Sequence, residues 1–160
     1  MIRVLSIDPG YERLGVAIFE KEGNSKERLI FSDCYRTEAS LKFEDRLFLL
    51  GDAIEKVIKN HSPSFLSIEN LFMSNNQKTA MRVSEVRGCI LYIARKNGLS
   101  ITEFTPLQIK LALTGDGKSN KEQIMKMTKL LIKDIRADAL DDEYDAIAAG
   151  LAFFAYKKYG

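Results

Sequence analysis

The chain has little of the chemistry on which many enzymes rely. Its 160 residues include one histidine, two cysteines and no tryptophan. A zinc cluster and a serine–histidine–acid triad with a spare base are therefore excluded. Cys34 and Cys89 are far apart and lack metal-site spacing, so we interpret them as small core residues. If the protein is an enzyme, its chemistry depends on carboxylates.

Long apolar runs and a strong net charge are also missing. No apolar segment is long enough to cross a bilayer, and the first stops at Asp8, too short for a secretory signal. We therefore expect no membrane association and a reducing, cytoplasmic location. The formal net charge is +2, with 46% hydrophobic and 29% charged residues, which is typical of a globular chain. We expect a single domain spanning residues 1–160.

Hydrophobic periodicity predicts alternating strands and helices in most of the chain. The expected strands are 4–8, 14–19, 28–35, 65–69 and 101–104. The expected helices are 43–61, a long one from residue 75 or 76 to 97, a short one from 106, one from about 119, and 141–154. Thr105 and Ser119 are the expected caps of the helices that follow them. This order predicts an α/β fold with a five-stranded mixed β-sheet flanked by α-helices.

Two of the expected strands end in an acid, Asp8 and Glu69. If these strands are parallel neighbours, both carboxylates emerge at the same edge of the sheet, where ligands of open α/β sheets bind. Taken alone, Asp8 has a simpler explanation, because aspartate often caps a turn. The catalytic interpretation therefore needs further acids at the same point.

Such acids open the last expected helix. Asp142 and Asp145 share one helix face, and so do Asp141 and Asp145, so spacing leaves the first member open. Acids at this end of a helix also interact favourably with its dipole. Together with the two strand-end acids, however, they would form the all-oxygen donor set that Mg²⁺ prefers. Two such ions about 3.5–4 Å apart can activate water and stabilise the leaving oxygen in phosphodiester cleavage.

Four segments, in this order, resemble the RuvC family of Holliday-junction resolvases. They are Ser6–Gly10, Ile68–Met73, Arg87–Gly88 and Asp142–Ala146. The resemblance covers nearly the whole chain. It implies a ribonuclease-H-like fold, a homodimer, and metal-dependent nicking of two opposed strands at a four-way DNA junction.

The resemblance also implies roles for individual residues. It makes Asp8, Glu69, Asp142 and Asp145 the catalytic acids and metal ligands, and so selects Asp142 over Asp141. The implied cofactor is Mg²⁺, as two ions per site, with Mn²⁺ as a substitute. A branch-migration motor complex is a further expected partner. The chain departs from the family at Glu143, where a small residue is usual, so a metal contact by Glu143 or Asp141 remains open.

Basic residues concentrate in two segments despite the small net charge. Residues 73–98 carry five lysines and arginines against one acid, and residues 106–136 carry seven against three. Phosphate contacts of such residues dominate nucleic-acid affinity, although an exposed helix face is also often rich in lysine. The residues that we expect to contact DNA are Lys78, Arg82, Lys110, Lys118 and Lys121. The resemblance places Lys110 and Lys121 near the scissile phosphate.

Two apolar features have alternative interpretations. Phe72 is either a core residue or, by the resemblance, an aromatic that inserts into the opened centre of the junction and stacks on bases. The stripe from Val83 to Ile93 is either ordinary core or, by the resemblance, part of the dimer interface.

We interpret the protein as a Holliday-junction resolvase, a Mg²⁺-dependent, structure-selective endodeoxyribonuclease of DNA recombination and repair. One alternative is another ribonuclease-H-like nuclease that acts on RNA or on an RNA–DNA hybrid. The other is a junction-binding protein without cleavage activity. The intact set of four acids argues against the loss of cleavage.

Overall fold

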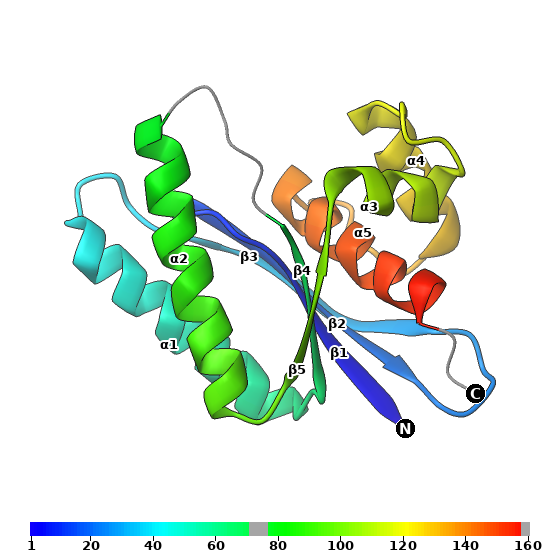
Figure 1. The fold of residues 1–160 in the computed structure, drawn as a ribbon, viewed down its shortest axis with the longest axis horizontal. Coiled ribbons are helices and arrows are strands. Elements are labelled where there is room, and N and C mark those ends of the chain that lie inside the picture. The colour runs from blue at the N-terminus through cyan, green and yellow to red at the C-terminus, as the bar shows by residue number, and fades with distance from the viewer. Residues whose placement is uncertain (71–76, 158–160) are drawn as a thin grey trace.

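The computed structural model describes residues 1–70 and 77–157, which form a five-stranded mixed sheet with helices on both faces (Figure 1). The sheet has the order β3-β2-β1-β4-β5. Its strands are β1 (Ile2–Asp8), β2 (Arg13–Lys21), β3 (Arg28–Arg36), β4 (Phe65–Glu69) and β5 (Ser100–Phe104). The α/β class and the mixed sheet expected from the sequence are confirmed.

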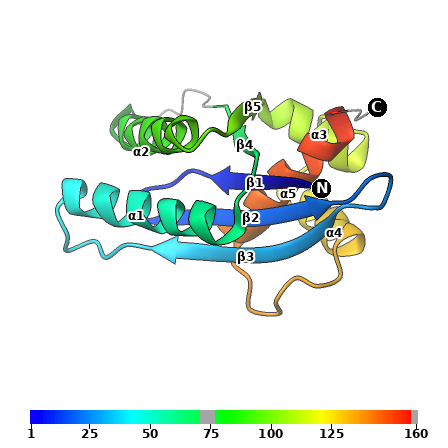
Figure 2. The ribbon, with the colours of Figure 1, turned by 90° about the horizontal axis from the view of Figure 1, so that it is seen from below.

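The helices form two layers, one on each face of the sheet (Figures 1 and 2). One layer contains α1 (Phe43–His61) and α2 (Gln77–Lys96), whose apolar sides share a core with the sheet. The other contains α3 (Pro106–Thr114), α4 (Lys121–Leu131) and α5 (Asp141–Tyr156), which enclose a second core. No helix in the described part of the chain is long and apolar enough to span a membrane.

The central strand β1 brings two acids to one edge. It pairs antiparallel with β2 and parallel with β4, with Ile7 opposite Ile68. Because the strands run in the same direction, Asp8 and Glu69, which follow these two residues, leave the sheet at the same end. The juxtaposition expected from the two strand ends is therefore confirmed.

Helix α5 lies close to the sheet because its middle consists of small residues. A Cβ at Gly150 would overlap the Phe19 ring on β2. The buried Ser67 hydroxyl of β4 donates to the carbonyl oxygen of Ala149 over 2.7 Å. This close approach fixes the height of α5 above β1 and β4, and so positions the acids at its start.

The apolar stripe of α2 belongs to the core of the described chain. Val86 and Ile90 are each about 1% exposed and pack in the cluster that contains Leu50 and Ile54 of α1. Of the two interpretations of this stripe, ordinary core is the one that the structure supports, because α1 and the sheet cover Val86 and Ile90.

The predicted cap of α4 and the predicted burial of the two cysteines need correction, whereas the predicted cap of α3 is confirmed. Thr105 caps α3 through a capping box with Gln108, as expected. The cap of α4 is Asn120 rather than Ser119, whose hydroxyl instead lies 2.7 Å from that of Thr114. Cys34 and Cys89 are only partly buried, so neither is a true core residue. The expected start of α2 at residue 75 or 76 lies outside the described residues.

Candidate active site

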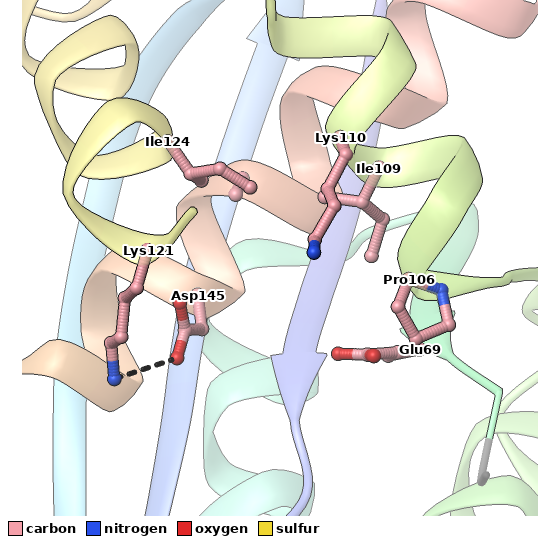
Figure 3. Close-up of a pocket in the computed structure, with 8 residues that line it drawn as sticks. Glu69, Pro106, Ile109, Lys110, Lys121, Ile124 and Asp145 are labelled. Carbon is pink, nitrogen blue, oxygen red and sulfur yellow. Dashed lines mark ion pairs between the residues drawn. The ribbon is translucent and has the colours of Figure 1, made fainter. Parts of the chain in front are cut away.

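Four acids from three elements gather at the ends of the central strands. Asp8 ends β1, Glu69 ends β4, and Asp142 and Asp145 belong to the start of α5. Glu69 and Asp145 line a cavity of about 220 Å³ between β4, α3, α4 and α5 (Figure 3). Its lining residues are Glu69, Pro106, Ile109, Lys110, Lys121, Ile124, Asp145 and Ala148.

Asp8 lies at the electrostatic centre of the group. Burial, followed by the negative charges of Asp145, Glu69 and Asp142, raises the pKa of Asp8 from 3.8 to about 8, while Lys121 opposes the rise. All three other acids therefore act on one carboxylate. A charged Asp8 is costly here unless a cation compensates it.

The two acids of the cavity show the same trend. Burial and then the charge of Asp145 raise the pKa of Glu69, and Lys110 opposes the rise. Burial also raises the pKa of Asp145, against the opposing effect of Lys121, which lies 3.6 Å from its Oδ2. In Figure 3 the carboxylate of Glu69 lies below Lys110, whereas that of Asp145 faces Lys121. The site is thus a set of desolvated acids beside two lysines.

Asp142 lies against the sheet rather than in the lining of the cavity. Its Oδ2 is 3.2 Å from Arg13 Nε but, although buried, accepts no hydrogen bond from the described residues. Its backbone oxygen lies directly over Gly15, which pairs with Asp8 across the β1–β2 ladder. A side chain at Gly15 would therefore displace the first turn of α5.

The expected DNA-contacting residues fall into distinct environments. Lys110 and Lys121 line the cavity, and Lys121 also pairs with Asp141 over 3.1 Å. Burial lowers the pKa of Lys121, but its bonds to Asp141 and Asp145 outweigh this and raise it. Lys78 and Lys118 are exposed. Phe72 lies outside the described residues, so its role remains a prediction.

Arg82 is less free than the exposed lysines. Its guanidinium carbon is 3.9 Å from the centroid of the Phe43 ring, and its Nη1 is 3.1 Å from Glu85. Arg82 can contact a phosphate without leaving the aromatic ring, because a stacked guanidinium still presents N–H donors at its edge.

The structure separates the two acids whose roles the sequence left open. Asp141 is exposed and faces Lys121. Glu143 is buried on the side of β3, where it bonds to Ser32 and Arg136. Behind burial and the charge of Asp142, the charge of Asp141 also raises the pKa of Asp145.

Two supporting arginines had not been assigned roles from the sequence. Arg87 of α2 donates from Nε to the backbone oxygen of Glu69 over 3.3 Å and pairs with Glu103 of β5. It thereby ties the end of β4 to its neighbours. In the sequence, Arg87 was marked only by its place in the Arg87–Gly88 segment. No sequence feature pointed to Arg13, which forms an ion pair with Asp142.

The donor set suits a divalent cation, although the side chains do not form a ready-made cage. Within residues 1–70 and 77–157, no three acids are spaced as ligands of one ion. All four nevertheless offer hard carboxylate oxygens, burial and then the acidic neighbours raise the pKa of Asp8, and Asp142 has a buried oxygen without a hydrogen-bond donor among the described residues. These are features of a site whose charge balance includes a cation.

The fold and this acidic edge define a protein with a ribonuclease-H-like fold that carries a carboxylate cluster at the ends of its central strands. Residues 4–153 match the family model described as "Crossover junction endodeoxyribonuclease RuvC". The chain belongs to the RuvC family.

Two relatives with this description are each 39% identical to the chain over the aligned residues. The protein from Caldicellulosiruptor saccharolyticus is 39% identical over 94% of this chain and 90% of its own length. That from Thermosipho melanesiensis is 39% identical over 92% of this chain and 93% of its own length. Both are named crossover junction endodeoxyribonuclease RuvC.

Solved structures agree with the family. The T. thermophilus RuvC structure in complex with a Holliday junction substrate is similar with a TM-score of 0.89 at 25% identity, over 98% of this chain and 94% of that chain. A yeast mitochondrial Holliday junction resolvase shares the fold, with a TM-score of 0.66 at 14% identity over 96% of this chain and 79% of that one.

Proposed function

We propose that this chain is a Holliday-junction resolvase, an endonuclease that nicks two opposed strands of a four-way DNA junction with the help of a divalent metal. The observation that carries the proposal is the convergence of four carboxylates from β1, β4 and α5 beside Lys110 and Lys121. Membership of the RuvC family and the likeness to a junction-bound relative support the substrate class. Residues 1–160 then act as one nuclease domain.

Asp8, Glu69, Asp142 and Asp145 are the residues that would hold the metal, with Mg²⁺ as the proposed ion and Mn²⁺ as a substitute. When bound, a metal pair of this kind supplies an activated water and stabilises the leaving oxygen. The chain's own contribution is to hold these acids close together. Burial and the neighbouring acids raise the pKa of Asp8, and burial above all raises the pKa of Glu69 and of Asp145, so the ionised form of these three acids is favoured when a cation compensates their charge.

Lys110 and Lys121 would contact the phosphate next to the bond that is cut. Both line the cavity that Glu69 and Asp145 share. Lys121 is held by Asp141 and Asp145, so its ammonium is already directed to the acidic edge (Figure 3). The exposed Lys78 and Lys118, with Arg82, would contact the DNA backbone farther away.

Paired nicks require two sites, so we propose that the protein acts as a homodimer. The outer surface of α1 and α2 supports this, because Phe48 is 72% exposed and Tyr92 is 69% exposed. Both line a groove of about 410 Å³ between these helices. Large exposed aromatics beside a groove are typical of protein interfaces. This surface replaces the buried stripe of α2 as the proposed contact.

Two further expectations remain proposals, of which the second rests on the family resemblance. They are the cytoplasmic location and the delivery of the junction by a branch-migration motor complex. A nuclease acting on RNA or on an RNA–DNA hybrid is the alternative substrate class, since the acid cluster alone does not distinguish these substrates.

The test compares four substrates of matched sequence: a four-way DNA junction, linear duplex DNA, single-stranded RNA and an RNA–DNA hybrid. Each is incubated with the protein in Mg²⁺ and in EDTA. We expect paired nicks in opposed arms of the junction, in Mg²⁺ only. Preferential cutting of RNA or of the hybrid would support the alternative nuclease, and tight junction binding without cutting would support a non-cleaving binder.

A further inference from the structure

Glu143 is a buried carboxylate immediately beside the catalytic acids, yet it faces away from them. Its side chain has no exposed surface. Oε1 accepts from the Ser32 hydroxyl over 2.6 Å, and Oε2 accepts from Arg136 Nη2 over 2.9 Å. Since both oxygens are bonded, the carboxylate is fixed in one orientation.

Its two partners belong to different parts of the fold. Ser32 lies on β3, and Arg136 lies in the segment between α4 and α5. Arg136 also reaches Asp33 of β3 over 3.5 Å, and Asp33 in turn accepts from the backbone N–H of Cys34. Glu143 therefore ties the start of α5 to an outer strand and to the segment that leads into the helix.

This tie matters because α5 begins without a side-chain cap. The residue at the N-cap is Leu140, which forms no capping hydrogen bond. Helix starts are commonly fixed by such a cap, so the first turn of α5 depends on other contacts. Exposed ion pairs of Lys121 and Arg13 hold it from outside. Its buried contacts include the packing of the Asp142 backbone oxygen over Gly15 and the two hydrogen bonds of Glu143.

We propose that Glu143, paired with Arg136, is a positioning residue that holds the first turn of α5 in place and thereby orients Asp142 and Asp145 for metal binding. The inference rests on the proposed function of those two acids as metal ligands. Groups that support metal ligands in this way affect metal affinity without touching the metal.

The test uses Glu143→Ala, which removes both bonds, and Glu143→Gln, which can accept from Arg136 and donate to the Ser32 hydroxyl. Glu20→Ala is the control, because Glu20 pairs with Arg3 and Arg28 at the opposite end of β2. The measurements are calorimetric titration of the DNA-free protein with Mg²⁺ and the Mg²⁺ concentration for half-maximal junction cutting.

We expect Glu143→Ala to weaken Mg²⁺ binding about 10-fold or more, the range seen when supporting groups of metal ligands are removed. Its half-maximal Mg²⁺ concentration should rise in parallel, and junction binding in EDTA should stay unchanged. Glu143→Gln and Glu20→Ala should remain close to wild type. If Glu143→Ala does not fold, Arg136→Gln provides the same test from the partner whose side chain is half exposed.

Wild-type Mg²⁺ affinity in the folded Glu143→Ala or Arg136→Gln protein would overturn the positioning role, and so would an equal loss in Glu20→Ala. The calorimetric comparison does not depend on junction cutting. A wild-type protein that binds Mg²⁺ but cuts no junction would contradict the resolvase proposal and leave the calorimetric comparison valid.

Discussion

The backbone oxygen of Asp142 lies directly over Gly15, the residue that pairs with Asp8 across the β1–β2 ladder. A Cβ at position 15 would overlap this oxygen and the carbonyl carbon behind it. Because Gly15 has no side chain, the first turn of α5 can lie close to β2. Asp142 is thereby brought near Asp8, the acid that ends β1.

Gly15→Ala should therefore displace the first turn of α5. We expect a loss of at least about 1–3 kcal/mol in the free energy of unfolding, the usual cost of overpacking, and a much larger loss of junction cutting. Denaturant unfolding and cleavage assays measure the two effects.

Gly88→Ala is the matched control, since a Cβ there meets nothing within 4 Å. It should stabilise helix α2 by about 0.5–1 kcal/mol. Equal effects of the two substitutions would contradict the account.

The raised pKa of Asp8 predicts a pH-dependent stability in the absence of metal. The pKa is about 8 in the folded protein against 3.8 as the reference value, so the folded state binds the proton more tightly. The resulting stabilisation is complete below 3.8 and is lost as the pH rises through about 8. Asp8→Asn does not titrate, so its stability relative to wild type should increase across this window.

Urea unfolding in EDTA at several pH values tests this prediction. Added Mg²⁺ should reduce the advantage of Asp8→Asn at the alkaline end, because the cation takes over the compensation of charge. A stability difference that does not change with pH would show that the environment of Asp8 is not the one described.

Lys121→Ala should impair cutting more than binding. Its ammonium is bonded to Asp141 and Asp145 at the acidic edge, where it would meet the scissile phosphate. A lysine that contacts only the DNA backbone would instead reduce the slope of log affinity against log salt by about one unit. Cutting rates at saturating protein, measured together with the salt dependence of binding, distinguish these cases. Wild-type cutting by the variant would remove Lys121 from the site.

Substitutions on α1 and α2 should separate dimerisation from folding. Phe48→Glu places a charge on the exposed groove and should yield a folded monomer that binds but does not make paired nicks. Ile90→Glu buries a charge in the core and should unfold the protein. Sedimentation and thermal melting provide the readouts. A wild type that is monomeric at micromolar concentration with junction bound would contradict the dimer proposal.

The local pattern of the sequence predicted most of the helices and strands. It also predicted that Asp8 and Glu69 lie at the same edge of the sheet. Helix α1 spans Phe43–His61 as expected, because the spacing of its apolar residues is a local signal. The capping box of α4 was placed one residue early, because Ser119 and Asn120 are both good caps. In the structure Asn120 forms the capping box with Gln123, and the Ser119 hydroxyl lies next to that of Thr114.

Features that depend on tertiary contacts were not predictable in the same way. The stripe of α2 has the same periodicity whether a core or a partner covers it, and only the position of α1 decides between them. Glu143 and Asp142 are adjacent acids in the sequence, yet one faces β3 and the other lies over Gly15. The pairing of Arg136 with Glu143 likewise depends on the path of the chain before α5.

The most direct test of the account is the cutting and binding of a four-way junction by Asp145→Asn. This substitution keeps the shape of the side chain and removes a charge from the site that would hold the metal. We expect cleavage in Mg²⁺ to fall by orders of magnitude, while binding in EDTA stays equal or becomes tighter, because one negative charge beside the DNA is gone. If Asp145 only stabilises the start of α5, asparagine should replace it at little cost. Near wild-type cutting by Asp145→Asn would therefore contradict the catalytic role of the acid cluster.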